Sequence, residues 1–323
     1  MNASRKTSTS GTKHAPETKK ASPAAHAHAQ RLSAEDESFV RAAAAFLERP
    51  SFLIRVADLV GRPVEAALDK LPQSAQRLVA RAVDGALARG LDWASGGLGA
   101  APLEIASVSA AGTRARGRGR RMSLVAAASG AVGGFAGIAV LPLELPVSTL
   151  ILLRSIAATA HEMGADLNDP ITRLECLSVL SLGSPSRSDD AAEVGYWATR
   201  VGLASAVREA ARVAAKVGAD DLTRIAFDRT APALLRLVGM IAGRFEAVVT
   251  ERALAQLLPV VGALSGAVVN TAFAQHFHTV ALYHFGLRRL ERQHGGVIVE
   301  ERYRAAHRAL HHAPARALLG AGH

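Results

Sequence analysis

The sequence predicts an all-α protein, a multi-helix bundle that contains two Gly/Ala-rich apolar helical segments. Ala, Leu, Arg and Glu outweigh the β-branched and aromatic residues that favour strands. Apolar side chains recur at helical spacing over long stretches, and no alternating run is long enough to require a strand. Because 49% of the 323 residues are apolar and only 4% are aromatic, the core is expected to consist mainly of Leu, Val and Ala.

The chain is expected to divide into five parts. Residues 1–35 are rich in Ser, Thr, Lys, Ala and His, and they cannot bury enough apolar surface to offset the entropy of ordering. We therefore predict a disordered basic tail there. The other parts are an N-terminal helical part at 36–110, an Arg/Gly hinge at 111–122, the main helical core at 123–300 and a C-terminal basic helix or tail at 301–323.

The N-terminal helical part has recognisable helix boundaries. Ser33 is followed by acidic residues, a pattern typical of an N-cap and the first turn of a helix. Pro50 is expected to separate this helix from the next. A second amphipathic stretch spans residues 63–93, and Pro72 is expected to break it once.

The first apolar segment, residues 123–143, contains no charged residue. A helix of this length is about 30 Å long, which matches the hydrocarbon thickness of a bilayer. Two overlapping pairs of glycines lie four positions apart, Gly130 with Gly134 and Gly133 with Gly137. Each pair lies on one face of a helix and would let a second helix approach closely.

The second apolar segment, residues 254–275, is also uncharged and contains Gly262 and Gly266 at the same spacing. Asn270 lies within it and is expected to form a hydrogen bond across helices that fixes their register. Both segments fit two interpretations, buried helices of a soluble bundle or hairpins that insert into a membrane. The sequence leaves both open.

Prolines and glycines predict the boundaries between these segments. Pro142 and Pro146 flank Glu144, and we expect the first apolar helix to break there. Gly164 is placed to end the resumed helix, and Asp169 followed by proline fits the start of the next one.

The remaining boundaries follow the same signals. Residues 183–190 form a polar stretch typical of an exposed loop. Helices are expected at about 191–216 and 220–257. Gly295 and Gly296 are expected to end the second apolar helix, before a short basic helix rich in histidine.

The formal charge of +10 is concentrated in the tail and in an arginine cluster next to the first apolar segment. Concentrated positive charge attracts anionic phospholipid or nucleic acid. Nucleic acid is less favoured, because no aromatic residues are interleaved for base stacking. We therefore expect a membrane surface or anionic lipid as the partner of the cluster, which consists of Arg114, Arg116, Arg118, Arg120 and Arg121.

Glu144 is the acidic residue most in need of an explanation, because it stands among apolar residues. A buried carboxylate is costly unless it is paired. Arg154 is the next charged residue along the chain, so we hypothesise a Glu144–Arg154 pair that holds a turn or faces a polar cavity. The alternative is a carboxylate exposed in a loop.

No pattern in the sequence identifies a reaction, a cofactor or a metal site, so the catalytic residues stay unknown. The glycines lack the Lys-Ser/Thr of a phosphate-binding loop. His276 and His278 share a predicted helix with His284, but residues two apart diverge by about 200°. A helical hydrolase whose residues come from distant positions stays the alternative.

Three stretches give the chain its resemblance to the EcsC family, a group of bacterial helical proteins. They are the glycine-rich segment with Leu141-Pro142-Leu143-Glu144-Leu145-Pro146 and Arg154, then Gly164 to Pro170, and then 258–270 with His284-Phe285 and 288–291. Glu144 stands where the family often has Asp, which keeps the charge. The resemblance implies association with the membrane or with membrane-transport machinery, and it supplies no catalytic residue.

We therefore expect a non-enzymatic membrane-associated protein that acts with ABC-transporter or envelope machinery. The absence of a secretory signal in residues 1–31 favours the cytoplasm, at the inner face of the membrane. The alternative is a soluble helical enzyme. A deep cavity that gathers Glu144, Arg154 and His284 would favour the enzyme.

Overall fold

The structure, a computed structural model, describes residues 32–48, 73–95, 107–117, 141–183, 195–216, 232–257 and 263–312. Regular secondary structure within these ranges is helical, with no strand among them, so the predicted all-α class is confirmed. A helix at 108–117 accompanies the labelled helices, which are α2 (Ala34–Leu47), α5 (Gln73–Ser95), α7 (Leu141–Glu162), α8 (Pro170–Leu182), α9 (Gly195–Ala214), α11 (Pro232–Leu257), α12 (Ala263–His294) and α13 (Gly296–His312).

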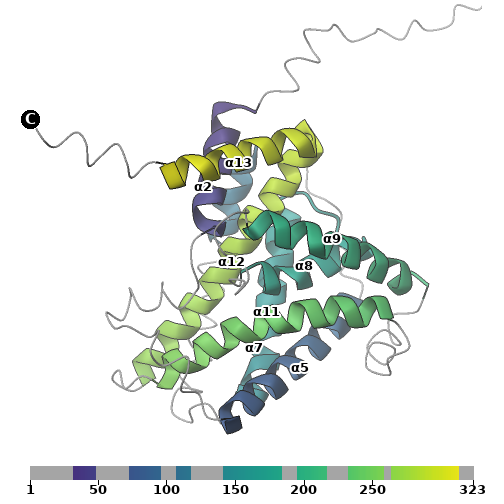
Figure 1. Ribbon diagram of the computed structural model, residues 1–323, viewed down its shortest axis with the longest axis vertical. Helices are drawn as coiled ribbons and strands as arrows, with labels where there is room; N and C mark the ends of the chain where they lie inside the picture. Colours follow the sequence, from purple (N-terminus) through teal and green to yellow (C-terminus); the bar gives the residue numbers. More distant parts are fainter. Residues whose placement is uncertain are drawn as a thin grey trace, which may run out of the picture.

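Helix α12 is the centre of the bundle. It has 32 residues, is about 48 Å long, and contacts α2, α7, α8, α11 and α13. Figure 1 shows it running diagonally through the molecule, with α2 and α13 at its C-terminal end and α11 towards its N-terminal end. Several of its side chains are buried, among them Phe273, Phe277, Val280, Phe285 and Leu290.

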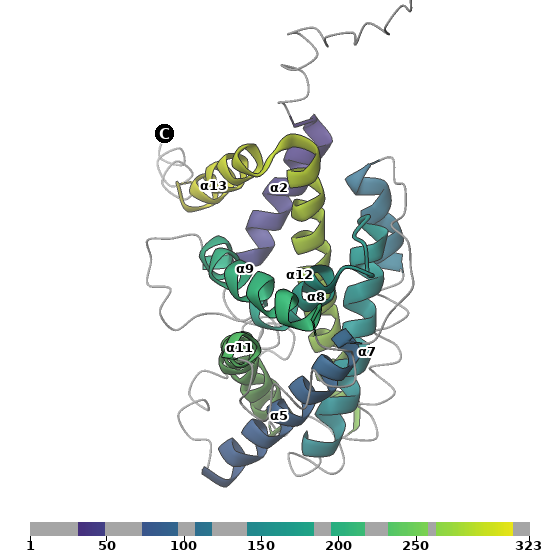
Figure 2. The same ribbon diagram turned by 90° about the vertical axis from the view of Figure 1, so that its right-hand side faces the viewer.

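Helices α5 and α7 share the most extensive interface in the described part of the chain. Figure 2 shows α5 crossing the lower part of α7. Glycines on α5 permit this approach. A Cβ at Gly85 would lie 3.3 Å from Pro146 Cγ, and a Cβ at Gly90 would lie 3.3 Å from Leu153 Cδ1, both on α7. The close helix contacts seen here therefore use glycines that lie outside the two apolar segments.

The core has the expected aliphatic composition, but the few aromatic residues gather within it. Phe245 of α11 lies 5.9 Å from Phe277 and 6.4 Å from Phe273, measured between ring centroids. Gly286 leaves space for the Phe39 ring of α2 to pack directly on the backbone of α12. Aromatic rings thus join α11 and α2 to the central helix.

Four predicted helix boundaries are confirmed. Ser33 caps α2, accepting a hydrogen bond from the Asp36 backbone N–H at 3.1 Å. Gly164 follows α7 with a φ of 74°, a conformation that favours glycine. Asp169 caps α8 with Pro170 in its first turn. Gly295 follows α12 with a φ of 92°.

The predicted break between Pro142 and Pro146 is wrong, because α7 begins at Leu141 and continues through Pro146. The first backbone N–H groups of a helix have no partner within the helix, so Pro142 loses no hydrogen bond there. Pro146 removes only one bond near the helix end. Glu144 therefore lies in the first turn of α7, where a carboxylate favours the helix dipole.

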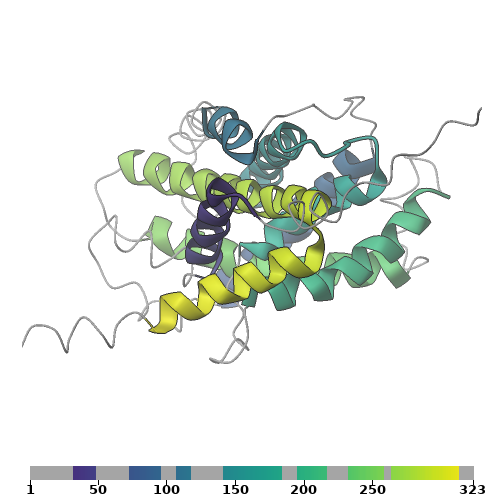
Figure 3. The same cartoon turned by 90° about the horizontal axis from the view of Figure 1, so that it is seen from above.

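Two of the predicted parts overlap helices of the described structure. Residues 108–117 are helical, so residues 111–117 of the predicted Arg/Gly hinge at 111–122 belong to a helix. Residues 301–312 belong to α13, which packs on α2, and Figure 3 shows these two helices lying against α12. Tyr303 is fully buried and donates a hydrogen bond to Glu48 at 2.8 Å.

Several predicted features fall outside the described residues. They are the tail at 1–31 and the residues Gly130, Gly133, Gly134, Gly137, Gly262, Arg118, Arg120 and Arg121. Gly266 lies within α12, but the structure does not describe what packs against it. The role of these glycines in helix packing stays a prediction.

Candidate functional site

Three helix ends meet at a buried charged cluster that we call the Glu144 cluster, which consists of Glu144, Arg252 and Asn270. Glu144 comes from the first turn of α7, Arg252 from the last turns of α11 and Asn270 from the N-terminal part of α12. Arg252 Nη2 lies 2.5 Å from Glu144 Oε1, and Asn270 Nδ2 donates to the same oxygen at 3.3 Å. The expected hydrogen bond of Asn270 across helices is therefore present.

Arg252 is fully buried, and the Glu144 side chain is only 14% exposed. The Arg252 guanidinium lies over the Phe273 ring, with its Cζ 4.9 Å from the ring centroid. Its Nε and Nη1 atoms have no hydrogen-bond partner among the described residues. Glu144 thus supplies the negative charge that compensates the buried Arg252. This ion pair connects α7 to α11.

The hypothesised Glu144–Arg154 pair is wrong. Both residues lie on α7, ten positions apart, which places them about 15 Å apart along the helix axis. Arg154 is exposed and has no ion-pair partner among the described residues. The break predicted at the prolines would have allowed the chain to fold back, and the continuous helix prevents it.

A second charged cluster joins α8, α9 and α12 near His284. Arg200 Nη2 of α9 lies 2.6 Å and 2.5 Å from the two carboxylate oxygens of Glu291 on α12. Arg288 Nη1 lies 3.3 Å from Glu291, and Arg288 Nη2 lies 2.8 Å from Glu175 Oε1 on α8. We call these four residues the charged network. It ties three helices together, and the Arg200 guanidinium also stacks on the Trp197 ring at 4.6 Å.

His284 adjoins the network and is 3% exposed. Its Nδ1 lies 2.9 Å from the Tyr196 hydroxyl, and its Nε2 has no hydrogen-bond partner among the described residues. Burial lowers the pKa of His284 well below its usual value, and the nearby Arg200 and Arg288 charges lower it further. Burial also raises the pKa of Glu175. His284 is therefore neutral in the folded protein.

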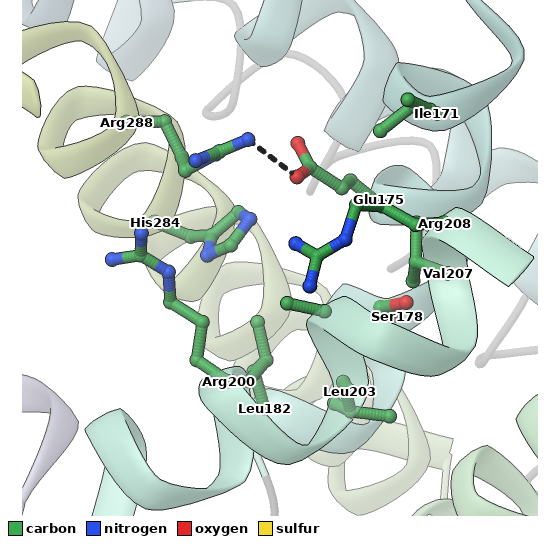
Figure 4. A pocket seen from close by; sticks show the side chains of 11 residues that line it. Ile171, Glu175, Ser178, Leu182, Arg200, Leu203, Val207, Arg208, His284 and Arg288 are labelled. Carbon is green, nitrogen blue, oxygen red and sulfur yellow. Dashed lines mark hydrogen bonds and ion pairs between the residues drawn. The ribbon is translucent and has the colours of Figure 1, made fainter. Parts of the chain in front are cut away.

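A cavity of about 160 Å³ lies between α8, α9 and α12 beside the network. Figure 4 shows the side chains of Arg208, Arg288, Glu175 and His284 converging on it. Its walls also include apolar side chains, namely Ile171, Leu182, Leu203 and Val207. The cavity combines cationic groups with an apolar surface.

The buried histidines predict that acid destabilises the fold. Burial lowers the pKa of both His278 and His284 in the folded state, so the unfolded chain binds more protons below its own histidine pKa of about 6.5. Their stabilising contribution is complete above that pH and is lost as the pH falls below it, by at most about 1.4 kcal/mol per pH unit for each group. Glu175, whose folded pKa is raised, contributes a change of opposite sign above its unfolded pKa.

Urea unfolding of the wild type and of His284→Gln, measured between about pH 7.5 and about pH 5.5, tests this expectation. The free energy of unfolding of the variant is expected to fall less steeply with acid than that of the wild type. Equal slopes would contradict the assignment of His284 as a buried neutral histidine.

Two other histidines of α12, His276 and His278, contact separate partners. The Nε2 of His276 donates to the Gly183 carbonyl at 2.7 Å. The Nδ1 of His278 lies 3.3 Å from the hydroxyls of both Ser155 and Thr159. The three histidines thus contact different parts of the fold: His276 contacts the residue that follows α8, His278 contacts α7 and His284 contacts α9.

The proposed polar residues do not form one site. Asn270 and His284 lie 14 positions apart on α12, about 21 Å along its axis. Because Glu144 contacts Asn270, the Glu144 cluster and the His284 cavity are separate. The structure therefore does not form the cavity of Glu144, Arg154 and His284 that would have favoured an enzyme.

The described arginines of the predicted anionic-surface cluster lie near the C-terminal end of α7. Arg114 Nε lies 3.2 Å from Glu162. Arg116 is exposed and its guanidinium contacts the Thr113 hydroxyl at 3.5 Å. Glu162 lies 18 positions after Glu144, about 27 Å along α7, so these arginines and the Glu144 cluster occupy opposite ends of that helix.

Sequence reasoning missed the partners in both clusters. Arg252 lies two positions before the uncharged segment 254–275, and a search for cations that flank the apolar segments would have found it. Arg200 and Glu175 come from separate helices, and no spacing in the sequence joins them to Glu291. The pair of Arg288 and Glu291, three positions apart on α12, was the one local signal.

Comparison with protein families identifies a family to which most of the chain is similar. The model of the EcsC protein family matches residues 41–290, which cover most of the chain. No curated protein and no solved structure matches it. The match includes the whole Glu144 cluster and every residue of the charged network except Glu291, and it confirms the resemblance seen in the sequence.

Proposed function

The chain belongs to the EcsC protein family, and we propose that it is a non-enzymatic, membrane-associated protein that acts with ABC-transporter or envelope machinery. The proposal places it in the cytoplasm, at the inner face of the membrane. It assigns membrane contact to the end of the bundle that carries the Glu144 cluster.

One observation supports this assignment most strongly: large apolar side chains are exposed at that end. Leu143 is 77% exposed and Val147 is 56% exposed, both in the first turns of α7, and Val268 of α12 is 40% exposed. The contacts of Glu144 with Arg252 and Asn270 hold α7, α11 and α12 together there. Exposed apolar side chains gathered at one end are typical of an interaction surface.

The sequence adjoining this end supports the same assignment. Residues 123–140 directly precede α7 and contain no charged residue. Residues 258–262, also uncharged, connect α11 to α12. We propose that these segments enter the lipid, in the manner of helical hairpins or interfacial segments.

The proposal favours shallow attachment over a conventional span. Among the described residues, one helix is apolar and long enough to cross a membrane, Pro142–Glu162, with a mean hydropathy of 1.4. Over half of its most apolar window, 56%, is buried inside the protein, as in the core helix of a soluble bundle. The proposal therefore assigns the lipid contact of α7 to its first turns, where Leu143 and Val147 are exposed.

Membrane fractionation tests the proposal. We expect the wild-type protein to sediment with membranes and to stay there after washes with high salt and then with alkaline carbonate. Replacing both Leu143 and Val147 with Glu is expected to release most of the protein, because each buried aliphatic side chain contributes about 1.5–3 kcal/mol to transfer from water. The fraction in the pellet is expected to fall at least about tenfold.

A matched control replaces two other exposed valines with Glu. Val201 is 61% exposed on α9 and Val297 is 71% exposed on α13, both away from the Glu144 cluster. This variant is expected to sediment like the wild type. Release by salt alone would indicate attachment through charge, and a wild-type protein that stays in the supernatant would refute the proposal.

A further inference from the structure

We propose that the cavity between α8, α9 and α12 binds a small organic anion, a carboxylate or phosphate with a short apolar part, through Arg208, Arg288 and His284. The site is independent of the proposed membrane contact, because it lies about 21 Å along α12 from the Glu144 cluster. In Figure 4 the three side chains converge from two different helices on the space beside Glu175.

The first observation that supports an anion site is that several buried hydrogen-bond donors beside the cavity lack an acceptor in the described part of the chain. The Nε of Arg288, the Nη1 of Arg200 and the Nε2 of His284 are buried, and each lacks a partner among the described residues. All three residues line the cavity. Nearly all buried polar groups in native proteins are paired, so such a set indicates a missing acceptor.

The Nε2 atom of His284 is also a hydrogen-bond donor, because the neutral imidazole carries its proton there. The Arg200 guanidinium, which can only donate, interacts with the Tyr196 hydroxyl oxygen and leaves the hydroxyl proton free for another acceptor. That acceptor is Nδ1 of His284, 2.9 Å away. In a neutral imidazole the proton then resides on Nε2, and the atom without a partner is an N–H group.

The charge of the site favours an anion. Within the charged network, Arg200 and Arg288 balance Glu175 and Glu291. Arg208 adds a further positive charge at the cavity wall, and it has no ion-pair or hydrogen-bond partner among the described residues. The carboxylate of Glu175 also faces the cavity, but Arg288 contacts it at 2.8 Å and burial raises its pKa, so its negative charge is offset.

Size and apolar lining restrict the ligand. A cavity of about 160 Å³ corresponds to about five water molecules. Leu203 and Val207 of α9 and Ile171 of α8 form part of its wall. An acid with a short alkyl chain fits this combination, with its oxygens on Arg208, Arg288 and His284 and its chain against the aliphatic side chains.

Isothermal titration calorimetry with the full chain tests the site, with butyrate and inorganic phosphate as probes and uncharged butyramide as the neutral analogue. We expect saturable binding of at least one anion and none of butyramide. Arg208→Gln is expected to weaken the binding about tenfold or more, since it removes a charge-assisted contact. Arg208 is exposed, so this variant is expected to fold.

Arg212→Gln is the matched control, because Arg212 is exposed on α9 one turn after Arg208 and does not line the cavity. It is expected to bind the probes like the wild type. The proposal is overturned if neither anion binds saturably up to about 10 mM, or if the two variants weaken binding equally.

Vesicles containing phosphatidylglycerol distinguish the source of the anion. A site for a free anion leaves vesicle binding of Arg208→Gln unchanged, whereas a site for a lipid headgroup weakens it relative to Arg212→Gln. Both outcomes agree with the anion site. Failure of the anion titrations leaves the membrane proposal untouched, since that proposal is tested through Leu143 and Val147.

Discussion

Replacing Arg252 with Met is expected to lower the free energy of unfolding by about 3–5 kcal/mol. The variant keeps a long side chain against Phe273 but removes the only cation that contacts Glu144 among the described residues. Glu144 would then lose its cationic partner at a site where its side chain is only 14% exposed. Urea unfolding followed by circular dichroism measures the loss.

The companion variant Glu144→Gln separates the ion pair from the packing. Removing the carboxylate alone strands the fully buried Arg252, so this variant is also expected to be destabilised. The double variant is expected to be more stable than the sum of the two losses predicts, with a coupling energy of about 1–3 kcal/mol. Losses that simply add would show that the 2.5 Å contact contributes nothing specific.

Arg154→Met is the matched control for this experiment. Arg154 lies on the same helix as Glu144 but is exposed and does not contact it. Its replacement is expected to change the free energy of unfolding by at most about 0.5 kcal/mol. If Arg154→Met lowered the free energy of unfolding as much as Arg252→Met does, that result would support the Glu144–Arg154 pair suggested by the sequence.

Helix boundaries were predictable because their causes are local. The Ser33 cap needs only a hydroxyl and the acidic residue three positions later, and both are visible in the sequence. Gly164 and Gly295 follow helices in the backbone conformation that glycine favours, and glycine at a helix end is itself the signal. The all-α class follows from the same kind of local evidence.

The start of α7 shows where a local rule misleads. Proline indicates a helix break in the interior of a helix, but it is tolerated in the first turn. The sequence around Pro142 and Pro146 fits both cases. Packing of Pro146 against Gly85 of α5, a contact between distant positions, accompanies the helical alternative.

The residue types of the candidate sites were predictable in part, but their partners were not. Glu144, Asn270 and His284 stood out because each polar side chain occurs in an apolar context. Arg252 is 108 positions from Glu144, and only the three-dimensional arrangement of α7 and α11 brings them together. The cavity beside His284 likewise depends on how three helices cross, which no spacing in the sequence records.

Glu291→Ala is expected to lower the free energy of unfolding by about 3–5 kcal/mol, the second large effect in the protein. Glu291 is 9% exposed and accepts contacts from Arg200 at 2.6 Å and 2.5 Å and from Arg288 at 3.3 Å. Its removal leaves Arg200 buried beside the Trp197 ring without the carboxylate that contacts it. Glu291→Gln keeps one acceptor oxygen and is expected to lose less, about 1–3 kcal/mol.

The control for Glu291 is an ion pair at the surface. Glu209 contacts Arg236 at 3.2 Å, but their side chains are 48% and 63% exposed. Glu209→Ala is expected to cost at most about 1 kcal/mol, because water and salt screen such a pair. Equal losses for Glu209→Ala and Glu291→Ala would mean that burial adds nothing to the charged network.

Added anion gives Glu291→Ala a second readout that a purely structural role would not produce. Without Glu291, the positive charges of Arg200 and Arg288 exceed the single negative charge of Glu175 next to the cavity. A bound anion would then replace part of the lost counter-charge, since a ligand that binds only the folded state stabilises it. Butyrate is therefore expected to raise the melting temperature of Glu291→Ala more than that of the wild type, and butyramide is expected to raise neither.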